Sequence, residues 1–277
     1  MLIPIASADD PRIAPYRALK DRDLDRGAGC FIVEGTIALE QLVRAGRFPV
    51  ESVFLSEKRT AALAPLLGQL THGIPVYTAP QAVMDSLAGY HLHRGVLALA
   101  RRSPALTAAQ LLADHPPGPL TLLVLIGLSN HDNVGACFRN AAALGASAIL
   151  LDQTSCDPLY RKAIRVSSGA ALTLPFSHAG DGPSLLASLA DARITTWSLS
   201  PTGGENINNL DPPQRLALLL GAEGPGLPYE LMARSRRVSI PMSGAMDSLN
   251  VATAGAIALA HVLARRHQQG VNVEPSP

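Results

Sequence analysis

Short apolar runs alternate with helical patterns throughout the first hundred residues. Apolar runs predict strands at 30–34, 53–55, 75–77 and 95–100. Apolar residues at helical spacing predict helices at 11–20, 36–45, 60–70 and 80–87. Gly46 directly follows the second helix, and glycine is the residue that most often ends a helix. The alternation predicts a small α/β domain over residues 1–102.

The second half of the chain repeats this alternation with more apolar runs. Strands are predicted at 120–127, 148–151, 171–175, 195–199, 216–221 and 238–242. Helices are predicted at 134–144, 158–167, 184–189 and from about 249 to 266. The first of these strands is apolar at nearly every position, which is typical of a parallel strand covered on both faces. We therefore expect an α/β domain with a parallel sheet over residues 120–277.

Prolines concentrate between the two halves. Residues 103–119 hold four prolines and one glycine around a short helical pattern at 108–113. This composition is typical of a linker.

Composition narrows the class of protein. Apolar residues make up 47% of the 277 residues, so the chain is expected to fold around a large core. A net charge of +1 neither requires nor excludes nucleic acid, because a local basic face can bind phosphate. The first residues do not resemble a secretion signal, and the apolar runs at 120–128 and 249–264 are too short or too polar to span a bilayer. We expect no membrane partner.

The three cysteines, Cys30, Cys137 and Cys156, are an odd number without C-x-x-C spacing. We expect buried core thiols in a reducing cytoplasm, and neither a disulfide framework nor a metal site.

Basic residues of the first domain form two groups. The first group is Arg12, Arg17, Lys20, Arg22 and Arg26, and the second is His91, His93 and Arg94. Aspartates at 21, 23 and 25 interleave with the first group. A solvated surface and an RNA-binding surface both fit this pattern.

The first motif with chemical potential is N-V-G-A-C-F-R-N, which begins at Asn133. Asn133 is expected at the cap of the helix or just before it, and Arg139 about one turn into the helix. Taken alone, the motif also fits a helix cap and an ordinary surface arginine.

The second motif is L-L-L-G-A-E-G-P-G-L-P, at 218–228. Its glycines, Gly221, Gly224 and Gly226, allow backbone to approach a flat ligand beside one acid, Glu223. It is not a P-loop, because no G-K-[ST] follows, and it lacks the G-x-G-x-x-G dinucleotide fingerprint.

The third motif joins I-P-M at 240–242 to S-L-N-V at 248–251. Asp247 and Ser248 are expected to cap a helix rich in small residues, which permits close packing. Ser248 and Asn250 are polar groups on an apolar element, so they need hydrogen-bond partners in the protein or in a ligand.

These three motifs, in this order, resemble those of the SpoU (TrmH-type) RNA ribose methyltransferases of the SPOUT superfamily. The shorter segments F-I-V-E-G at 31–35 and H-R-G-V at 93–96 resemble the family's substrate-binding domain, which is similar to a ribosomal RNA-binding protein. The resemblance implies a parallel α/β sheet with a C-terminal trefoil knot, after a small α/β RNA-binding domain. It also implies a homodimer that uses S-adenosylmethionine to methylate a ribose 2′-hydroxyl in structured RNA, either tRNA or rRNA.

The resemblance also assigns roles to individual residues. Five polar residues match its catalytic positions: Asn133, Arg139, Glu223, Ser248 and Asn250. The expected cofactor-binding residues are Leu199, Ser200, Gly221, Ala222, Gly226, Ile240, Met242 and Leu249. Many members have Asp-Pro where this chain has His131-Asp132. Because a guanidinium does not readily lose its proton, we expect Arg139 to clamp a phosphate of the RNA rather than act as a base.

Two other functions stay open at this point. One is an RNA-binding protein with an inactive catalytic domain, against which the five retained polar residues argue. The other is an ordinary α/β nucleotide-binding oxidoreductase, against which the missing phosphate fingerprint argues.

Overall fold

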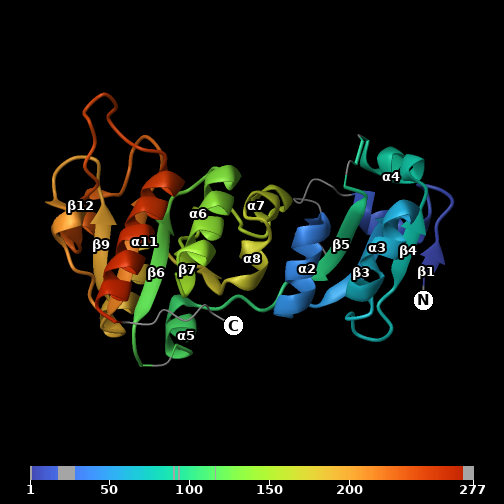
Figure 1. Cartoon of the computed structure of the whole chain (residues 1–277), viewed down its shortest axis with the longest axis horizontal. Coiled ribbons are helices and arrows are strands. Elements are labelled where there is room, and N and C mark those ends of the chain that lie inside the picture. Colours follow the sequence, from blue (N-terminus) through green and yellow to red (C-terminus); the bar gives the residue numbers. More distant parts are fainter. Residues whose placement is uncertain (1, 18–28, 90, 93, 116, 271–277) are drawn as a thin grey trace. The chain divides into compact units, whose positions relative to one another are not determined.

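The computed structural model describes residues 2–17, 29–89, 91–92, 94–115 and 117–270, which divide into two compact units (Figure 1). The first unit is Met1–Pro104 together with Leu159–Thr173, and the second is Ala105–Pro158 together with Leu174–Pro277. The predicted boundaries of 1–102, 103–119 and 120–277 stay a prediction, and they do not anticipate that Leu159–Thr173 groups with the first unit. Four of the basic residues noted above lie outside the described residues: Lys20, Arg22, Arg26 and His93.

The first unit is built on a five-stranded mixed sheet. Its strands, in spatial order, are β1 (Leu2–Pro4), β4 (Val76–Ala79), β3 (Val50–Ser56), β5 (Val96–Arg101) and β2 (Cys30–Glu34). The first three strands run parallel, whereas β5 is antiparallel to both β3 and β2. The helices are η1 (Pro11–Arg17, a 3-10 helix), α2 (Thr36–Ala45), α3 (Glu57–Leu67), α4 (Gln81–Ala88), α7 (Arg161–Val166) and α8 (Ala170–Thr173).

One core of this unit lies between the sheet and the helices η1 and α4. Ile13 and Tyr16 of η1 and Met84 of α4 are fully buried against Ile32 and Phe54 of the sheet. The buried Tyr16 hydroxyl is paired with the Ser52 hydroxyl at 2.7 Å, which satisfies both polar groups inside the core.

The second unit is built on a seven-stranded sheet in which every neighbouring pair is parallel, as the apolar runs predict. Its strands, in spatial order, are β10 (Glu205–Asn206), β12 (Arg236–Ser239), β9 (Thr195–Leu199), β11 (Arg215–Gly221), β6 (Leu120–Ile126), β7 (Ala148–Leu151) and β8 (Phe176–His178). The helices are α5 (Ala108–Ala113), α6 (His131–Ala143), α9 (Gly182–Asp191), η2 (Ile207–Asn209), α10 (Tyr229–Ala233) and α11 (Val251–Gln268).

Helices cover both faces of this sheet. Leu122 and Val124 of β6 share an apolar core with Leu111 of α5, Leu185 of α9 and Leu231 of α10. The helices α6 and α11 lie side by side over the opposite face (Figure 1). The α/β class with a parallel sheet is therefore confirmed, whereas the trefoil knot stays a prediction.

Small residues bring α11 close to the sheet. A Cβ atom at Gly255 would lie 2.8 Å from Cδ1 of Leu220 on β11, so glycine is what permits this approach. Near the other end of α11, the buried Arg266 donates to the carbonyl oxygens of Leu120, Pro213 and Gln214. These hydrogen bonds fasten the end of the helix to the beginnings of β6 and β11 and satisfy a charge that is out of contact with water.

Two predicted strands are displaced. The strand predicted at 171–175 is wrong: α8 occupies most of this range, and β8 begins at Phe176. Gly169, at φ +86°, packs so tightly on α2 that a Cβ atom there would lie 3.0 Å from Cβ of Gln41. The chain therefore makes a further helical turn against α2 before it reaches the sheet. Similarly, β12 ends at Ser239, before most of the predicted 238–242 run.

Two helix starts also differ. Asn130 caps α6 by accepting from the Asp132 amide at 2.9 Å, so the predicted start at 134 is three residues late. Asn250, rather than Asp247 or Ser248, caps α11. The terminal strand β1, the edge strand β10 and the short helices η2 and α10 were not predicted as elements.

Membrane-spanning helices and metal-binding clusters are both absent from the described residues. None of their helices is both long and apolar enough to cross a membrane. Within the same part of the chain, no group of His, Cys, Asp and Glu is arranged to hold a metal ion.

Candidate active site

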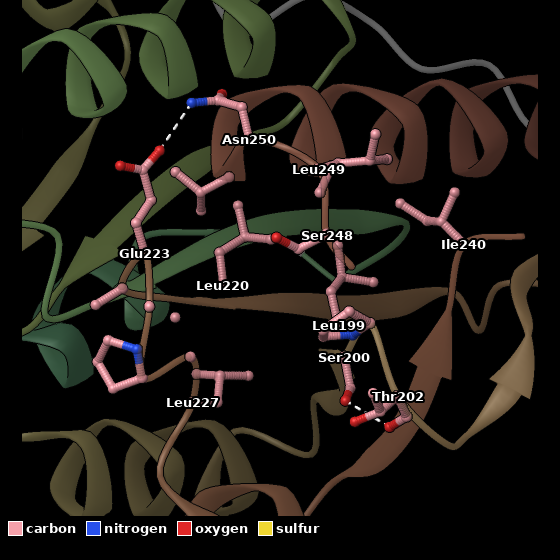
Figure 2. Close-up of a pocket in the computed structure, with 18 of the residues that line it drawn as sticks. Leu199, Ser200, Thr202, Leu220, Glu223, Leu227, Ile240, Ser248, Leu249 and Asn250 are labelled. Carbon is pink, nitrogen blue, oxygen red and sulfur yellow. Dashed lines mark hydrogen bonds between the residues drawn. The ribbon is translucent and has the colours of Figure 1, made fainter. Parts of the chain in front are cut away.

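A cavity of about 550 Å³ opens at the carboxyl ends of β9, β11 and β12, beside the start of α11 (Figure 2). The sheet places these three strands next to one another, so Leu199, Gly221 and Ile240 meet although they are distant in sequence. Ligands of parallel α/β sheets bind at this edge, because the loops after the strands gather there.

The predicted cofactor-binding residues all line this cavity: Leu199, Ser200, Gly221, Ala222, Gly226, Ile240, Met242 and Leu249. Three of the predicted catalytic residues, Glu223, Ser248 and Asn250, line it as well. Thr202 also lines the cavity and was not predicted; its carbonyl oxygen accepts a 2.7 Å hydrogen bond from the Ser200 hydroxyl. The P-T-G-G turn directly after the strand at 195–199 is the signal that identifies this third loop.

The glycine-rich turn at 221–226 folds back on the end of β11. Gly226 donates its amide to the Ala222 carbonyl at 3.0 Å, and a Cβ atom at Gly221 would lie only 2.3 Å from the carbonyl carbon of Gly226. Real Cβ atoms do not approach backbone so closely, so only glycine fits at 221. Gly224 and Gly226 have positive φ values of 87° and 69°, which other residues rarely adopt.

Asn250 joins two of the three motifs to the start of α11. Its Oδ1 accepts from the amides of Ala252 at 3.0 Å and Thr253 at 3.3 Å, which caps the helix. Its Nδ2 donates to Oδ1 of Asn133 and to Oε1 of Glu223, both at 2.9 Å; Figure 2 shows the bond to Glu223. The side-chain amide therefore makes four hydrogen bonds, which fixes the direction in which it points.

Asn133 does not have the capping role that its position suggested. It is the third residue of α6, and its side chain is directed to Asn250. A second link lies nearby, where Nδ2 of Asn140 donates to the Ala252 carbonyl at 2.9 Å. Together the two bonds hold the beginning of α11 against α6.

Arg139 and Ser248 lie outside this hydrogen-bond network. Arg139 is exposed on α6, more than two turns from the start of the helix rather than one, since α6 begins at His131. It has no hydrogen-bond or ion-pair partner among the described residues, and it does not line the cavity. Ser248 lines the cavity without capping α11.

A buried acid supports the loop that leads into α6. Asp152 accepts from the Gly127 amide at 2.9 Å, the Ser155 amide at 3.0 Å and the Ser155 hydroxyl at 2.6 Å. The Ser155 hydroxyl oxygen in turn accepts a 3.0 Å hydrogen bond from the Leu128 amide. These contacts fix the chain just before Asn130, and the spacing in sequence carried no signal for them.

The cysteines do not supply a nucleophile to this site. Burial raises the pKa of Cys137 on α6 to about 12 and, largely through burial, that of Cys156 to about 11. Both thiols therefore keep their protons near neutral pH, and the thiolate is the reactive form.

Comparisons with known proteins identify the family of this chain. Residues 121–260, just over half of the chain, match the SpoU rRNA methylase family. Residues 32–105 match a family described as RNA 2′-O ribose methyltransferase substrate binding. An uncharacterized tRNA/rRNA methyltransferase of Mycobacterium bovis is 41% identical over 264 residues, which span 92% of this chain and 89% of that protein.

Two solved structures have the same fold. The AdoMet-bound rRNA methyltransferase from Sinorhizobium meliloti has a TM-score of 0.81 at 23% identity, over 96% of this chain and 98% of that one. The SpoU methyltransferase AviRb from Streptomyces viridochromogenes, in complex with AdoMet, has a TM-score of 0.80 at 23% identity, over 94% and 100%. These structures match the fold, and the family model and the mycobacterial relative show the family: the chain belongs to the SpoU rRNA methylase family and is an RNA methyltransferase.

Proposed function

We propose that the cavity binds S-adenosylmethionine and that the enzyme methylates a ribose 2′-hydroxyl in tRNA or rRNA. The observation that carries this proposal is the arrangement around one cavity, where the glycine turn, the I-P-M segment and the start of α11 meet. The match of residues 32–105 to a ribose methyltransferase substrate-binding family supports the 2′-hydroxyl as acceptor.

The lining of the cavity fits this cofactor. Leu199, Leu220 and Leu249 offer apolar side chains to a flat adenine, and the glycine turn lets backbone amides and carbonyls approach its edge. The volume of about 550 Å³ is in the range of sites for ligands of this size. Glu223 is the one acid among the lining residues, and its charge favours a cationic ligand.

When bound, S-adenosylmethionine supplies a methyl group already activated by a positively charged sulfur. The chain must then hold the acceptor oxygen in line and stabilise negative charge as that oxygen loses its proton. We assign the charge stabilisation to Arg139, which clamps the phosphate next to the target ribose. Its exposed position suits a contact with RNA rather than with the cofactor.

Glu223 and the two asparagines have a positioning role in this proposal. Glu223 is held by Asn250, and no hydrogen bond or ion pair joins it to Arg139 among the described residues. Asn250 in turn is oriented by Asn133 and by the helix amides it caps. Ser248 is available to contact substrate, because α11 is capped by another residue.

We also propose that the enzyme is a cytoplasmic homodimer. Leu249 and Ile257, at and near the start of α11, are 37% and 38% exposed, and Met246 just before them is 73% exposed. A second subunit would remove this apolar surface from water. Sedimentation at low micromolar concentration that finds only a species near the 29.0 kDa of one chain would contradict the dimer.

The experiment has two parts. Calorimetry should detect binding of S-adenosylmethionine and of its demethylated product. Incubation with total tRNA and with total rRNA, followed by digestion to nucleosides and mass spectrometry, should then reveal a 2′-O-methylated nucleoside. Cofactor binding without transfer to either RNA would favour the alternative, an inactive RNA-binding protein; no cofactor binding by folded protein would reject the proposed cofactor site.

A further inference from the structure

Helix α7 belongs to the methylase half by sequence, but it packs with the first unit. It lies inside the 121–260 match to the SpoU methylase family, whereas its contacts place Leu159–Thr173 with Met1–Pro104. Within this unit α7 packs against β2, the edge strand, and α8 packs against α2. The unit that matches the substrate-binding family is therefore completed by a segment from the other half of the sequence.

The docking of this segment uses the F-I-V-E-G motif. Glu34, the fourth residue of the motif, is buried and accepts a 3.1 Å hydrogen bond from Nη1 of Arg161. The next residue, Gly35, has φ +99°, and a Cβ atom there would lie 2.9 Å from Nη1 of Arg94, the arginine of the H-R-G-V motif. The two short motifs thus meet at one end of β2, where the Arg94 side chain lies against Gly35 and Arg161 donates to the Glu34 carboxylate.

The exposed side of α7 is basic. Arg161, Lys162 and Arg165 lie within five residues, and residues 158–173 contain no acid. Ala163 and Ile164 are buried against the unit, whereas Lys162 and Arg165 are exposed. These two positions are three residues apart in a helix and are therefore neighbours on its surface.

We propose that Lys162 and Arg165 of α7, together with Arg94, contact phosphates of the substrate RNA. This inference rests on the proposed function, since it takes RNA as the substrate. Arg94, Lys162 and Arg165 are all exposed, so an RNA can reach each of these cationic side chains from solvent. A surface of this kind binds a polyanion largely by releasing its counterions.

The test uses the full-length enzyme, because a truncation after residue 104 would uncover the surface on which β2 and α2 hold α7 and α8. The first variant is the double substitution Lys162→Gln with Arg165→Gln. The matched control is Lys58→Gln with Arg59→Gln, which removes two exposed cations from α3 of the same unit. Helix α3 packs on β3 and β4, away from the β2 edge of the sheet.

The measurement is binding of total tRNA, and separately of fragmented total rRNA, over a series of KCl concentrations. The α7 variant should lose on the order of tenfold in affinity at 0.15 M salt, and its salt slope should fall by about 1.4 to 1.8 for two lost phosphate contacts. The control should keep both values. Lys162→Arg with Arg165→Lys should also keep them, because the charges remain.

Equal losses in the α7 variant and the control would overturn the proposal, since they would report net charge alone. Unchanged RNA binding by the α7 variant, or no RNA binding by the unaltered enzyme, would overturn it as well. Calorimetry with S-adenosylmethionine separates this outcome from failure of the proposed function. The cofactor affinity should be the same in every variant, and its absence in the unaltered enzyme would count against the cofactor site instead.

Discussion

Asn250 on α11 donates its side-chain amide to Oδ1 of Asn133 on α6 at 2.9 Å, across 117 positions of sequence. The same amide group donates to Glu223, which lines the cavity. One side chain therefore caps a helix, links two helices and orients an acid. This relationship suggests that capping and positioning can be separated by substitution.

Asn250→Asp should separate the two roles. The aspartate can still accept from Ala252 and Thr253, so the cap is kept, but it has no amide protons for Asn133 and Glu223. We expect methyl transfer to fall on the order of a hundredfold at neutral pH, where the new carboxylate beside Glu223 also lowers the stability of the fold. Two adjacent carboxylates raise each other's pKa, so some activity should return as the pH is lowered and a proton bridges them.

The control for this prediction is Asn250→Ala, which removes the cap as well. It should lower the free energy of unfolding by about 1 kcal/mol in addition to the loss of rate. Kinetics from pH 5 to 8 and urea unfolding measure both effects. An Asn250→Asp enzyme with an unchanged rate would refute the positioning role.

Gly221→Ala should weaken cofactor binding. The added Cβ would lie 2.3 Å from the backbone of the returning turn, which would have to move away from β11 and out of the cavity wall. We expect at least a tenfold loss of S-adenosylmethionine affinity in calorimetry, since 1.4 kcal/mol corresponds to a factor of ten. Gly68→Ala is the control, because Gly68 has φ −67° and the atoms nearest to an added Cβ would lie 3.6 Å from it. Equal cofactor affinity in both variants would contradict the close-approach argument.

Arg139→Ala should reduce methyl transfer by a hundred- to a thousand-fold and leave cofactor affinity nearly intact, because the proposed partner of Arg139 is RNA. Arg139→Lys should restore part of the rate, since lysine keeps the charge without the planar fork. The pH–rate profile of the lysine variant distinguishes two roles. A clamp loses rate when the lysine deprotonates, whereas a base gains rate at that point. A gain would reject the clamp.

Glu34→Gln should destabilise the first unit, because it removes the carboxylate that Arg161 contacts in a mostly buried setting, with side chains 9% and 22% exposed. We expect a loss of about 2 to 3 kcal/mol in the free energy of unfolding, somewhat below the cost of breaking a fully buried pair. Glu205→Gln is the matched control: its pair with Arg236 is 56% and 44% exposed and should contribute less than about 1 kcal/mol. Similar losses of unfolding free energy in urea would mean that the mostly buried Glu34–Arg161 pair contributes no more stability than the exposed Glu205–Arg236 pair.

Asp85 should give the first unit an acid-sensitive contact. The His91 side chain, then the Gln81 side chain and the Leu92 amide, lower the Asp85 pKa from 3.8 to about 2. A carboxyl group whose pKa is lower in the folded state stabilises the fold at pH values above its unfolded pKa. This stabilisation is lost as the pH falls through the folded pKa. The melting temperature of the unaltered protein should therefore fall between about pH 4 and pH 2. Asp85→Asn should be less stable at pH 7 and flatter over that range; an unchanged acid profile would refute the assignment.

Several features of the protein follow from the sequence alone, because they depend on neighbours in the chain. Helix α2 has the predicted bounds, since its apolar spacing and Gly46 are local signals. The same is true of the strands β2 and β9, which are short apolar runs between breaks. The eight predicted cofactor-binding positions line one cavity because each lies at or after the end of a strand or just before a helix, and such segments gather at one edge of a parallel sheet.

Other features were decided only by contacts between distant segments. Asn250 caps α11 in preference to Ser248, and its amide bonds to Asn133 and Glu223 depend on α6 and β11 lying beside it. The 171–175 segment contains an apolar run that fits a strand. Most of it instead forms the helix α8, because Gly169 packs on α2. Helix α7 groups with the first unit, in which it packs against β2 and Arg161 contacts Glu34, 127 positions away. Local patterns carry no information about which distant segment will be the partner, so these choices require the folded chain.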